Sequence, residues 1–137
     1  MINIEIYLDE IKDIMAKYAV YGINLDYLKI NDEPRLNIAV AIVGKDINTG
    51  EKACGIRIDR QISDSAISSA KGAIGYNKKS NKYDPTLMDK ATKLDTDRKF
   101  IQHLILHEIA HHKGYTQEEE YECDKWAFSE MEELGWL

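Results

Sequence analysis

Cysteine, proline and long apolar runs are all scarce in this chain, and each shortage argues against a class of protein. Its 137 residues include two cysteines, Cys54 and Cys123, which lie far apart, so a disulfide framework is not expected. The longest clear apolar run, Ile38 to Val43, is far shorter than the roughly 20 residues of a membrane-spanning helix. With two prolines, no internal repeat and no low-complexity tract, the chain is typical of a compact folded protein.

Positive charge is also in short supply. The 18 Lys and Arg residues stand against 24 Asp and Glu residues, and the net charge of -6 argues against binding to nucleic acid or to anionic membranes. The first ten residues contain acids and no basic stretch, unlike a signal peptide, so we expect a cytoplasmic protein. A chain of this length, with 44% hydrophobic and 31% charged residues, predicts a single globular domain over 1–137.

Histidine, by contrast, is concentrated in one place. The chain has four histidines, and all fall within ten residues: His103, His107, His111 and His112. Residues 107–111 read H-E-x-x-H, and on a helix residues four apart share a face, so His107 and His111 can bind one zinc ion. Glu108 lies about 100 degrees round the helix, beside the metal. It is therefore expected to be the general base that activates a zinc-bound water.

The segment after this motif predicts a second helix, close behind the first. Gly114 is a natural helix stop, and Thr116 followed by Glu119 forms a capping box, so a new helix should begin at once. Two helices joined by so short a turn are expected to run antiparallel, side by side.

The register of this helical hairpin predicts the third zinc ligand. If the turn is centred between residues 115 and 116, His111 lies opposite Glu120 and His107 lies opposite Asp124. We therefore predict a site in which His107, His111 and Glu120 bind zinc. Asp124 is expected to accept a hydrogen bond from a zinc-binding imidazole and fix its orientation. The neighbouring acids Glu118 and Glu119 suit a helix N-terminus, and Glu119 is the better capping residue.

The two halves of the hairpin together resemble a known group of enzymes. The first half is H-E-x-x-H, and the second, residues 120–127 (Glu-Tyr-Glu-Cys-Asp-Lys-Trp-Ala), is similar to E-x-E-A-[DN]-x-[FW]-A. These are the paired motifs of gluzincin metallopeptidases of the ImmA/IrrE and M48 types. The resemblance implies a zincin-like fold and proteolytic activity. It also implies that Glu120 is the third zinc ligand and that Asp124 takes the position of the Asp or Asn four residues later.

The chain departs from that pattern in two places, and a rival spacing exists. Eight residues separate His111 from Glu120, fewer than in those families, and Cys123 stands where they have Ala. The spacing H-E-x-x-H-x-x-G-x-x-Q also resembles that of metzincins, but it would make Gln117 the third ligand, and Gln is a poor zinc ligand. We rank the gluzincin interpretation first.

The rest of the chain predicts an α+β fold. Apolar residues at helical spacing predict an N-terminal helix over 4–21, with a short strand at 2–6 as the lesser alternative. Residues 23–34 are ambiguous. Segments 36–43 and 52–60 predict two strands joined by a turn at 44–50, hence a small antiparallel sheet before the zinc-binding hairpin.

Between the sheet and the hairpin, the pattern is weaker. A short edge strand is predicted at 73–77 and a solvated loop at 77–83. Asp84 and Pro85 should begin a short helix through about Leu94, and Asp95 or Thr96 should cap the next one. Peptidases of this type bind their substrate as an added strand along an exposed sheet edge, and 73–77 and 52–59 are the two alternatives for that edge.

The function predicted is a zinc-dependent metallopeptidase acting on a protein or peptide, with its oligomeric state left open. The alternative is a non-catalytic, metal-stabilised protein-interaction domain of the same fold. A structural zinc site usually closes with a fourth ligand, often cysteine, but Cys123, one residue before Asp124, is expected to point elsewhere and fill a packing position. His103 is interpreted as a packing or outer residue and His112 as a contact to solvent or substrate. Four residues are unranked donors to a developing oxyanion: His112, Tyr115, Tyr76 and Arg98.

Overall fold

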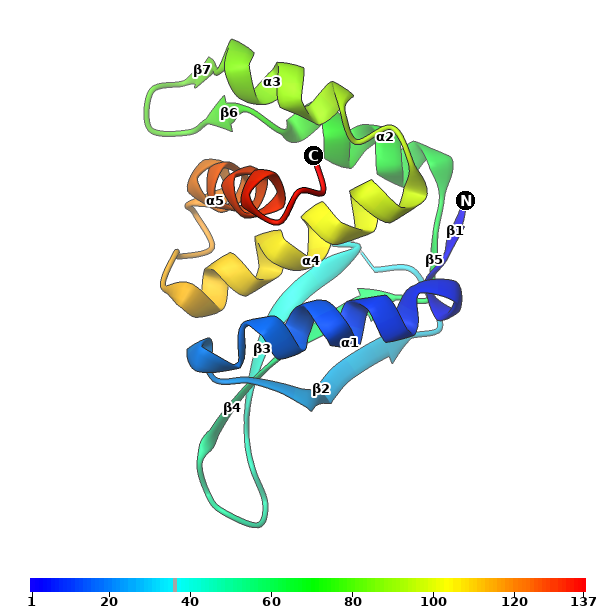
Figure 1. Ribbon diagram of the computed structural model, residues 1–137, viewed down its shortest axis with the longest axis vertical. Coiled ribbons are helices and arrows are strands. Elements are labelled where there is room, and N and C mark those ends of the chain that lie inside the picture. The colour runs from blue at the N-terminus through cyan, green and yellow to red at the C-terminus, as the bar shows by residue number, and fades with distance from the viewer. Residues whose placement is uncertain (36) are drawn as a thin grey trace.

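The computed structural model describes residues 1–35 and 37–137. The fold is α+β, as predicted, with a helix at the N-terminal end, small sheets, and the helical hairpin at the C-terminal end (Figure 1). In chain order the elements are β1 (Ile2–Asn3), α1 (Leu8–Lys17), β2 (Ile23–Asn31), β3 (Ala39–Lys45), β4 (Lys52–Asp59), β5 (Gln61–Ile62), α2 (Asp64–Ala73), β6 (Tyr76–Asn77), β7 (Lys82–Tyr83), α3 (Pro85–Thr92), α4 (Asp97–Lys113) and α5 (Glu120–Glu133).

The N-terminal helix is shorter than the predicted span of 4–21. A 3-10 turn, Ile4–Tyr7, precedes α1, and another, Ala19–Tyr21, follows it. Gly22, at φ +82, ends this region in the left-handed conformation that glycine adopts without strain. The alternative at the start of the chain also occurs in part, because β1 pairs antiparallel with β5.

The main sheet is mixed, so the prediction of a purely antiparallel sheet is wrong. Its strand order is β2-β4-β3: β3 pairs antiparallel with β4, as predicted, but β2 pairs parallel with β4 on the other side. The strand predicted over 36–43 is β3, which begins at Ala39, and residue 36 lies outside the described residues. The central position of β4 explains why its residues are buried on both faces.

Strand β2 occupies the segment that the sequence left ambiguous, and its irregular register gives the reason. The pairing with β4 shifts between Ile23 and Leu28, so the two-residue alternation of a regular strand is broken there. At this bulge the backbone of Tyr27 lies against Gly55 so closely that a Cβ on Gly55 would collide with the Tyr27 carbonyl. Only glycine fits that position of β4.

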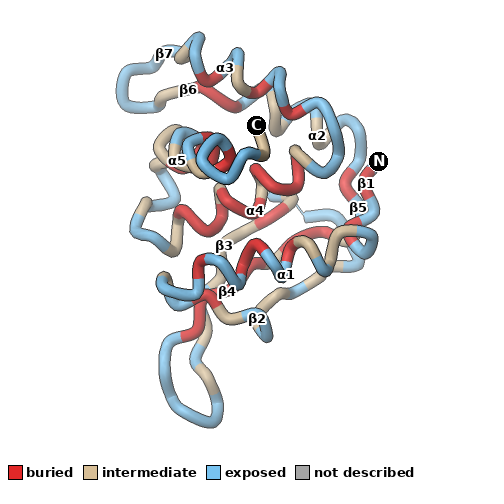
Figure 2. Tube along the Cα trace, in the orientation of Figure 1, coloured by how far each residue is buried: buried red, intermediate tan, exposed pale blue. Residues whose placement is uncertain are grey.

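Helix α4 is the centre of the molecule. Helices α1 and α4 cover one face of the sheet, and α5 packs on α4 (Figure 1). Figure 2 shows buried residues along much of α4, whereas the outer layer of α2, α3 and the β6–β7 hairpin is largely exposed.

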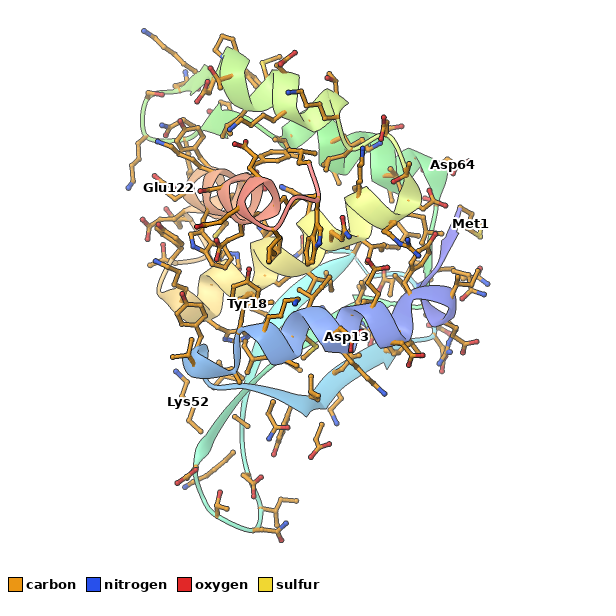
Figure 3. The ribbon with its side chains drawn as sticks, in the orientation of Figure 1. Met1, Asp13, Tyr18, Lys52, Asp64 and Glu122 are labelled. Carbon is orange, nitrogen blue, oxygen red and sulfur yellow. The ribbon has the colours of Figure 1, made fainter. Side chains whose placement is uncertain are left out.

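The outer layer contains the least predictable part of the chain. Helix α2 lies between the predicted strands at 52–60 and 73–77, where the sequence shows no clear pattern. The Ser63 side chain caps it by accepting the Ala66 N–H at 3.1 Å. The N-terminal ammonium forms an ion pair with Asp64 at the start of α2, where the two residues lie together (Figure 3). Of the predicted strand at 73–77, residues 76 and 77 are extended, and they pair with β7.

In the described parts of the chain, no helix is both long enough and apolar enough to cross a bilayer.

Candidate metal centre

Helix α4 presents two histidines on one face. Thr96 caps the helix, as predicted, with its hydroxyl oxygen accepting the Lys99 N–H at 3.2 Å. The rings of His107 and His111 then lie one turn apart, with centroids separated by 5.3 Å. Both side chains are largely buried, so their nitrogen atoms are directed by protein groups more than by solvent.

The contacts between α4 and α5 follow the register derived from the sequence. His107 Nδ1 lies 2.7 Å from Asp124 Oδ1, and His111 Nε2 lies 3.4 Å from Glu120 Oε1. The same register continues one turn further, where the rings of His103 and Phe128 pack with centroids 4.3 Å apart. Residues far from the turn therefore meet in the order that the turn's centre predicts.

The turn itself differs from the prediction. Helix α5 begins at Glu120 and not directly after Thr116, although the Thr116 N–H donates to Glu119 Oε1 at 3.0 Å, which is half of the predicted capping box. Figure 1 shows α5 nearly end-on while α4 runs across the view, so the helices cross and are not strictly antiparallel. The longer connection, residues 114–119, allows this crossing.

Hydrogen bonds on the far side of each ring direct both Nε2 atoms toward Glu120. Asp124 accepts from Nδ1 of His107, and the backbone carbonyl of Tyr115 lies 3.1 Å from Nδ1 of His111. With Nδ1 protonated in both rings, Nε2 is the atom left to bind a metal. The Glu120 carboxylate lies between them, 2.5 Å from Nε2 of His107 and 3.4 Å from Nε2 of His111.

Cys123 is a second potential donor, and its predicted direction is wrong. The thiol is buried and lies beside His111, because Cys123 follows Glu120 by three residues and so shares its face of α5. Donor atoms of His107, His111 and Cys123 lie within 4.8 Å of one another. However, Sγ is 3.6 Å from Nδ1 and 3.8 Å from Nε2 of His111, so it sits beside the ring and not ahead of the Nε2 lone pair. Glu120 is the better placed of the two donors.

Glu108 lies between the histidine pair and the sheet. Its side chain is buried, and Oε1 accepts the backbone N–H of Ala41, in β3, at 3.1 Å. The same oxygen is 4.0 Å from Nε2 of His111. A carboxylate in this place reaches the space in front of the histidines without occupying the position between their Nε2 atoms.

The pKa values of these groups reflect their burial and mutual contacts. Burial raises the pKa of Glu108 above its usual value, against the opposing effect of the two histidines. Burial alone would lower the pKa of His107, but Asp124 and Glu120 outweigh it and hold that pKa well above its usual value. Burial likewise opposes the shift of Glu120, yet its hydrogen bonds to the two histidines lower its pKa to about 2. Without metal, these contacts favour the protonated form of His107 and the ionised form of Glu120.

The two remaining histidines have structural contacts. His103 is buried between Phe128 and Asp124, with Nε2 3.3 Å from Asp124 Oδ1, and burial lowers its pKa to about 4. His112 is half-buried and lies with Nε2 2.7 Å from the carbonyl oxygen of Gly55, so it joins α4 to β4, a contact that was not predicted. It lies about 100 degrees round α4 from His111 and so takes no part in the His107–His111 pair.

The other residues suggested from the sequence as donors to an oxyanion also have partners elsewhere. Arg98 pairs with Glu10 at 3.0 Å near the start of α4, and the Tyr76 hydroxyl donates to Asn81 at 2.6 Å in the β6–β7 hairpin. Tyr115 contributes its backbone carbonyl to His111, a role that the sequence does not signal.

A cavity of about 550 Å³ opens beside the cluster. One end is lined by His107, Glu108, Glu120 and Asp124, and the walls come from α4, α2 and the start of β3. The contribution of α2 is absent from the sequence-based site, because a serine- and alanine-rich segment carries no recognisable helical face.

No protein-family description, no curated protein and no solved structure matches this chain in comparisons with known proteins.

Proposed function

We propose that the chain is a zinc-dependent metallopeptidase in which His107, His111 and Glu120 hold the metal and Glu108 is the general base. The observation that carries the proposal is the convergence of the Glu120 carboxylate on both Nε2 atoms, at 2.5 and 3.4 Å, with Glu108 alongside. Two imidazoles and one carboxylate are a ligand set of catalytic zinc sites, which leave one position open.

The donor set fits zinc, because each imidazole has its Nδ1 engaged and its Nε2 directed to the same point. When bound, zinc supplies Lewis-acid polarisation of water and of the scissile carbonyl. Asp124 holds the Nδ1 proton of His107 and so keeps Nε2 available as a ligand.

Glu108 moves the proton in this scheme. Its carboxylate takes a proton from the attacking water oxygen and later gives it to the nitrogen of the leaving amine. A pKa raised by burial makes the Glu108 carboxylate a stronger base than an exposed glutamate. Before a peptide binds, the Ala41 N–H orients this carboxylate.

The substrate edge is β3 in this proposal, and neither of the two segments suggested by the sequence. Strand β4 is central, and β6 belongs to a separate hairpin. The Ile38 carbonyl accepts from Asp59 on the β4 side, whereas the Ala41 N–H donates away from β4, to Glu108. Backbone groups of alternate β3 residues therefore face the candidate metal centre, where an extended peptide can add as a strand.

The alternative, a non-catalytic metal-stabilised interaction domain, is favoured by one observation, the thiol of Cys123 beside His111. A site closed by His107, His111, Glu120 and Cys123 would have no open position. Cobalt substitution separates the two: a thiolate ligand produces an intense sulfur-to-cobalt charge-transfer absorption, and the peptidase proposal expects none.

The main test is Glu108→Gln, with Glu122→Gln as a matched control at a partly exposed position of α5 that pairs with Lys79. The zinc-loaded Glu108→Gln protein should lose hydrolysis of a quenched-fluorescent peptide pool by about 10²–10⁴-fold, the usual contribution of a general base. Zinc content and melting temperature should stay near those of the parent protein. A Glu108→Gln protein that keeps full activity contradicts the mechanism.

A further inference from the structure

The cavity beside the candidate metal centre follows one face of α4. It is lined by Phe100, Leu104 and Glu108, which are spaced by four residues and therefore lie in a row. From Phe100 to Glu108 the row spans about 12 Å at the rise of an α-helix. The cavity thus begins at the general base and continues along α4, away from the turn that joins α4 to α5.

The opposite wall is made of small side chains. Helix α2 contributes Ala66, Ala70 and Ala73 to the lining, again at a spacing of three to four residues. Ile38, before β3, and Ile74, directly after α2, add apolar surface, while Ser65 and Ser69 are polar residues that α2 also contributes. Because alanine fills so little space, this face of α2 leaves the cavity open where leucine or phenylalanine would close it.

Size and chemistry together indicate the occupant. At about 550 Å³ the cavity lies within the range of about 300–1,000 Å³ for pockets that bury small organic ligands, so it has room for the largest amino-acid side chains. Its lining combines apolar residues of α2, α4 and the start of β3 with the carboxylates of Glu108, Glu120 and Asp124 at the candidate metal centre. Acidic side chains would meet like charge there, and apolar ones would gain burial.

We infer that this cavity is the specificity pocket of the enzyme and that it receives a large apolar or aromatic side chain from a residue next to the scissile bond. The inference rests on the proposed function, because it takes the metal centre as the place of cleavage. Ala70, in the middle of the alanine row, sets the size limit. A bulkier residue at this position shortens the pocket without touching the zinc ligands or Glu108.

The test uses Ala70→Leu with Ser68→Leu as its matched control. Ser68 is exposed on the same helix and is not part of the cavity lining, so it adds the same bulk outside the pocket. Two series of blocked peptides share one central bond. In one series the residue before that bond is either Ala or Phe, and in the other series the residue after it is either Ala or Phe. The measured quantity is the ratio of kcat/KM for the Phe peptide to that for the Ala peptide, on zinc-loaded full-length protein.

The parent protein and Ser68→Leu should prefer the Phe peptide of one series by more than about tenfold, as apolar pockets do. Ala70→Leu should lower this ratio by about tenfold, because the Phe peptide loses more activity than the Ala peptide does. If the peptides are cleaved and the ratio is the same in all three proteins, the pocket assignment is wrong and the proposed function stands.

If no protein cleaves any peptide, the proposed function fails and binding decides the pocket separately. The probe is then a fluorescent naphthylalanine peptide, compared with its alanine counterpart on zinc-loaded Glu108→Gln protein. Weaker naphthylalanine binding by about tenfold after adding Ala70→Leu, and not after adding Ser68→Leu, supports the pocket. Equal binding by both double variants overturns it.

Discussion

The two helices that form the candidate metal centre differ in how firmly they hold their side chains. On α4, the side chains of His107, His111 and Glu108 are 13%, 4% and 8% exposed. Each also contacts a protein group other than the two Nε2 atoms that would bind metal. On α5, the side chain of Glu120 is 55% exposed, and its carboxylate contacts the two histidines themselves.

This difference implies a division of work within the site. The α4 residues are positioned by burial, by Asp124 and by the backbone of Tyr115 and Ala41, so their geometry does not depend on metal. Glu120 is held by its contacts with Nε2 of His107 and of His111, which also lower its pKa to about 2, so its position depends on whether those nitrogens carry protons or a metal ion. The α4 half is preorganised, and the α5 half closes the site.

The largest expected effect comes from removing the α5 ligand. Glu120→Ala should weaken zinc binding by more than about a hundredfold, since even loss of a partner outside the ligand shell costs about 10–100-fold. Cys123→Ala, one turn along the same face, should change zinc affinity by less than about threefold if Cys123 is not a ligand. Competition with a fluorescent chelator measures both. The reverse order of effects would assign the third position to Cys123.

A smaller effect is expected when the support of a histidine is altered. Asp124→Asn preserves shape but removes the charge that holds Nδ1–H of His107, so zinc affinity should fall by about 10–100-fold. Phe128, which contacts His103 in the next pair of the register, offers a control. Phe128→Leu should lower the melting temperature and leave zinc affinity nearly unchanged. Equal affinity in Asp124→Asn and the parent protein would show that Asp124 does not orient the ligand.

The pH dependence of stability should have opposite signs with and without zinc. The raised pKa of His107 means that the metal-free fold stabilises its protonated form. That contribution is fully present below the unfolded value of about 6.5 and is lost as the pH rises through the folded pKa. Zinc binding instead requires Nε2 to lose its proton, so it strengthens over the same range.

Melting curves above pH 6.5 test this directly, because His103, with a pKa lowered to about 4, is neutral there in both states. The metal-free protein should melt at lower temperature as the pH rises, and the zinc-loaded protein at higher temperature. Parallel trends in the two samples would show that the histidine pair is not the zinc site.

The smallest effect is expected at the surface of the α5 half. Lys79 lies in the β6–β7 hairpin, with Nζ 3.7 Å from Glu119 Oε2 and 3.4 Å from Glu122 Oε1. Figure 3 shows Glu122 on the outer side of α5. Exposed ion pairs contribute about 0–1 kcal/mol, so Lys79→Ala should change the free energy of unfolding by less than about 1 kcal/mol. Urea denaturation measures it. A larger loss would mean that the hairpin, and not α4, organises the start of α5.

The helical hairpin was predictable because its signals are local. Helix periodicity, the glycine stop and the turn's centre depend on residues a few positions apart, and they place His107 opposite Asp124 and His111 opposite Glu120, as observed. The crossing of the helices and the position of the Cys123 thiol were not predictable in this way. Both depend on the length of the connection after Gly114 and on how α5 rotates about its axis.

The parts that sequence reasoning missed depend on distant partners. Strand β2 is irregular because Tyr27 passes over Gly55, a residue 28 positions later. Helix α2 has one large apolar side chain, Ile67, and its Ala66 and Ala70 both line the cavity and pack against the core. The zinc ligands, the general base and the peptidase activity itself stay predictions until metal and hydrolysis are measured.

The bond between the Ala41 N–H and Glu108 has a consequence for hydrogen–deuterium exchange. In the described part of the chain β3 pairs only with β4, so amides on its other edge lack a strand partner and should exchange quickly. The Ala41 amide is the exception, since its proton is held by a carboxylate of the candidate site. Its exchange rate is therefore a label-free signal of what happens at Glu108: protonation of the carboxyl group or replacement of its oxygen by a bound peptide would change the rate of a single, identifiable amide.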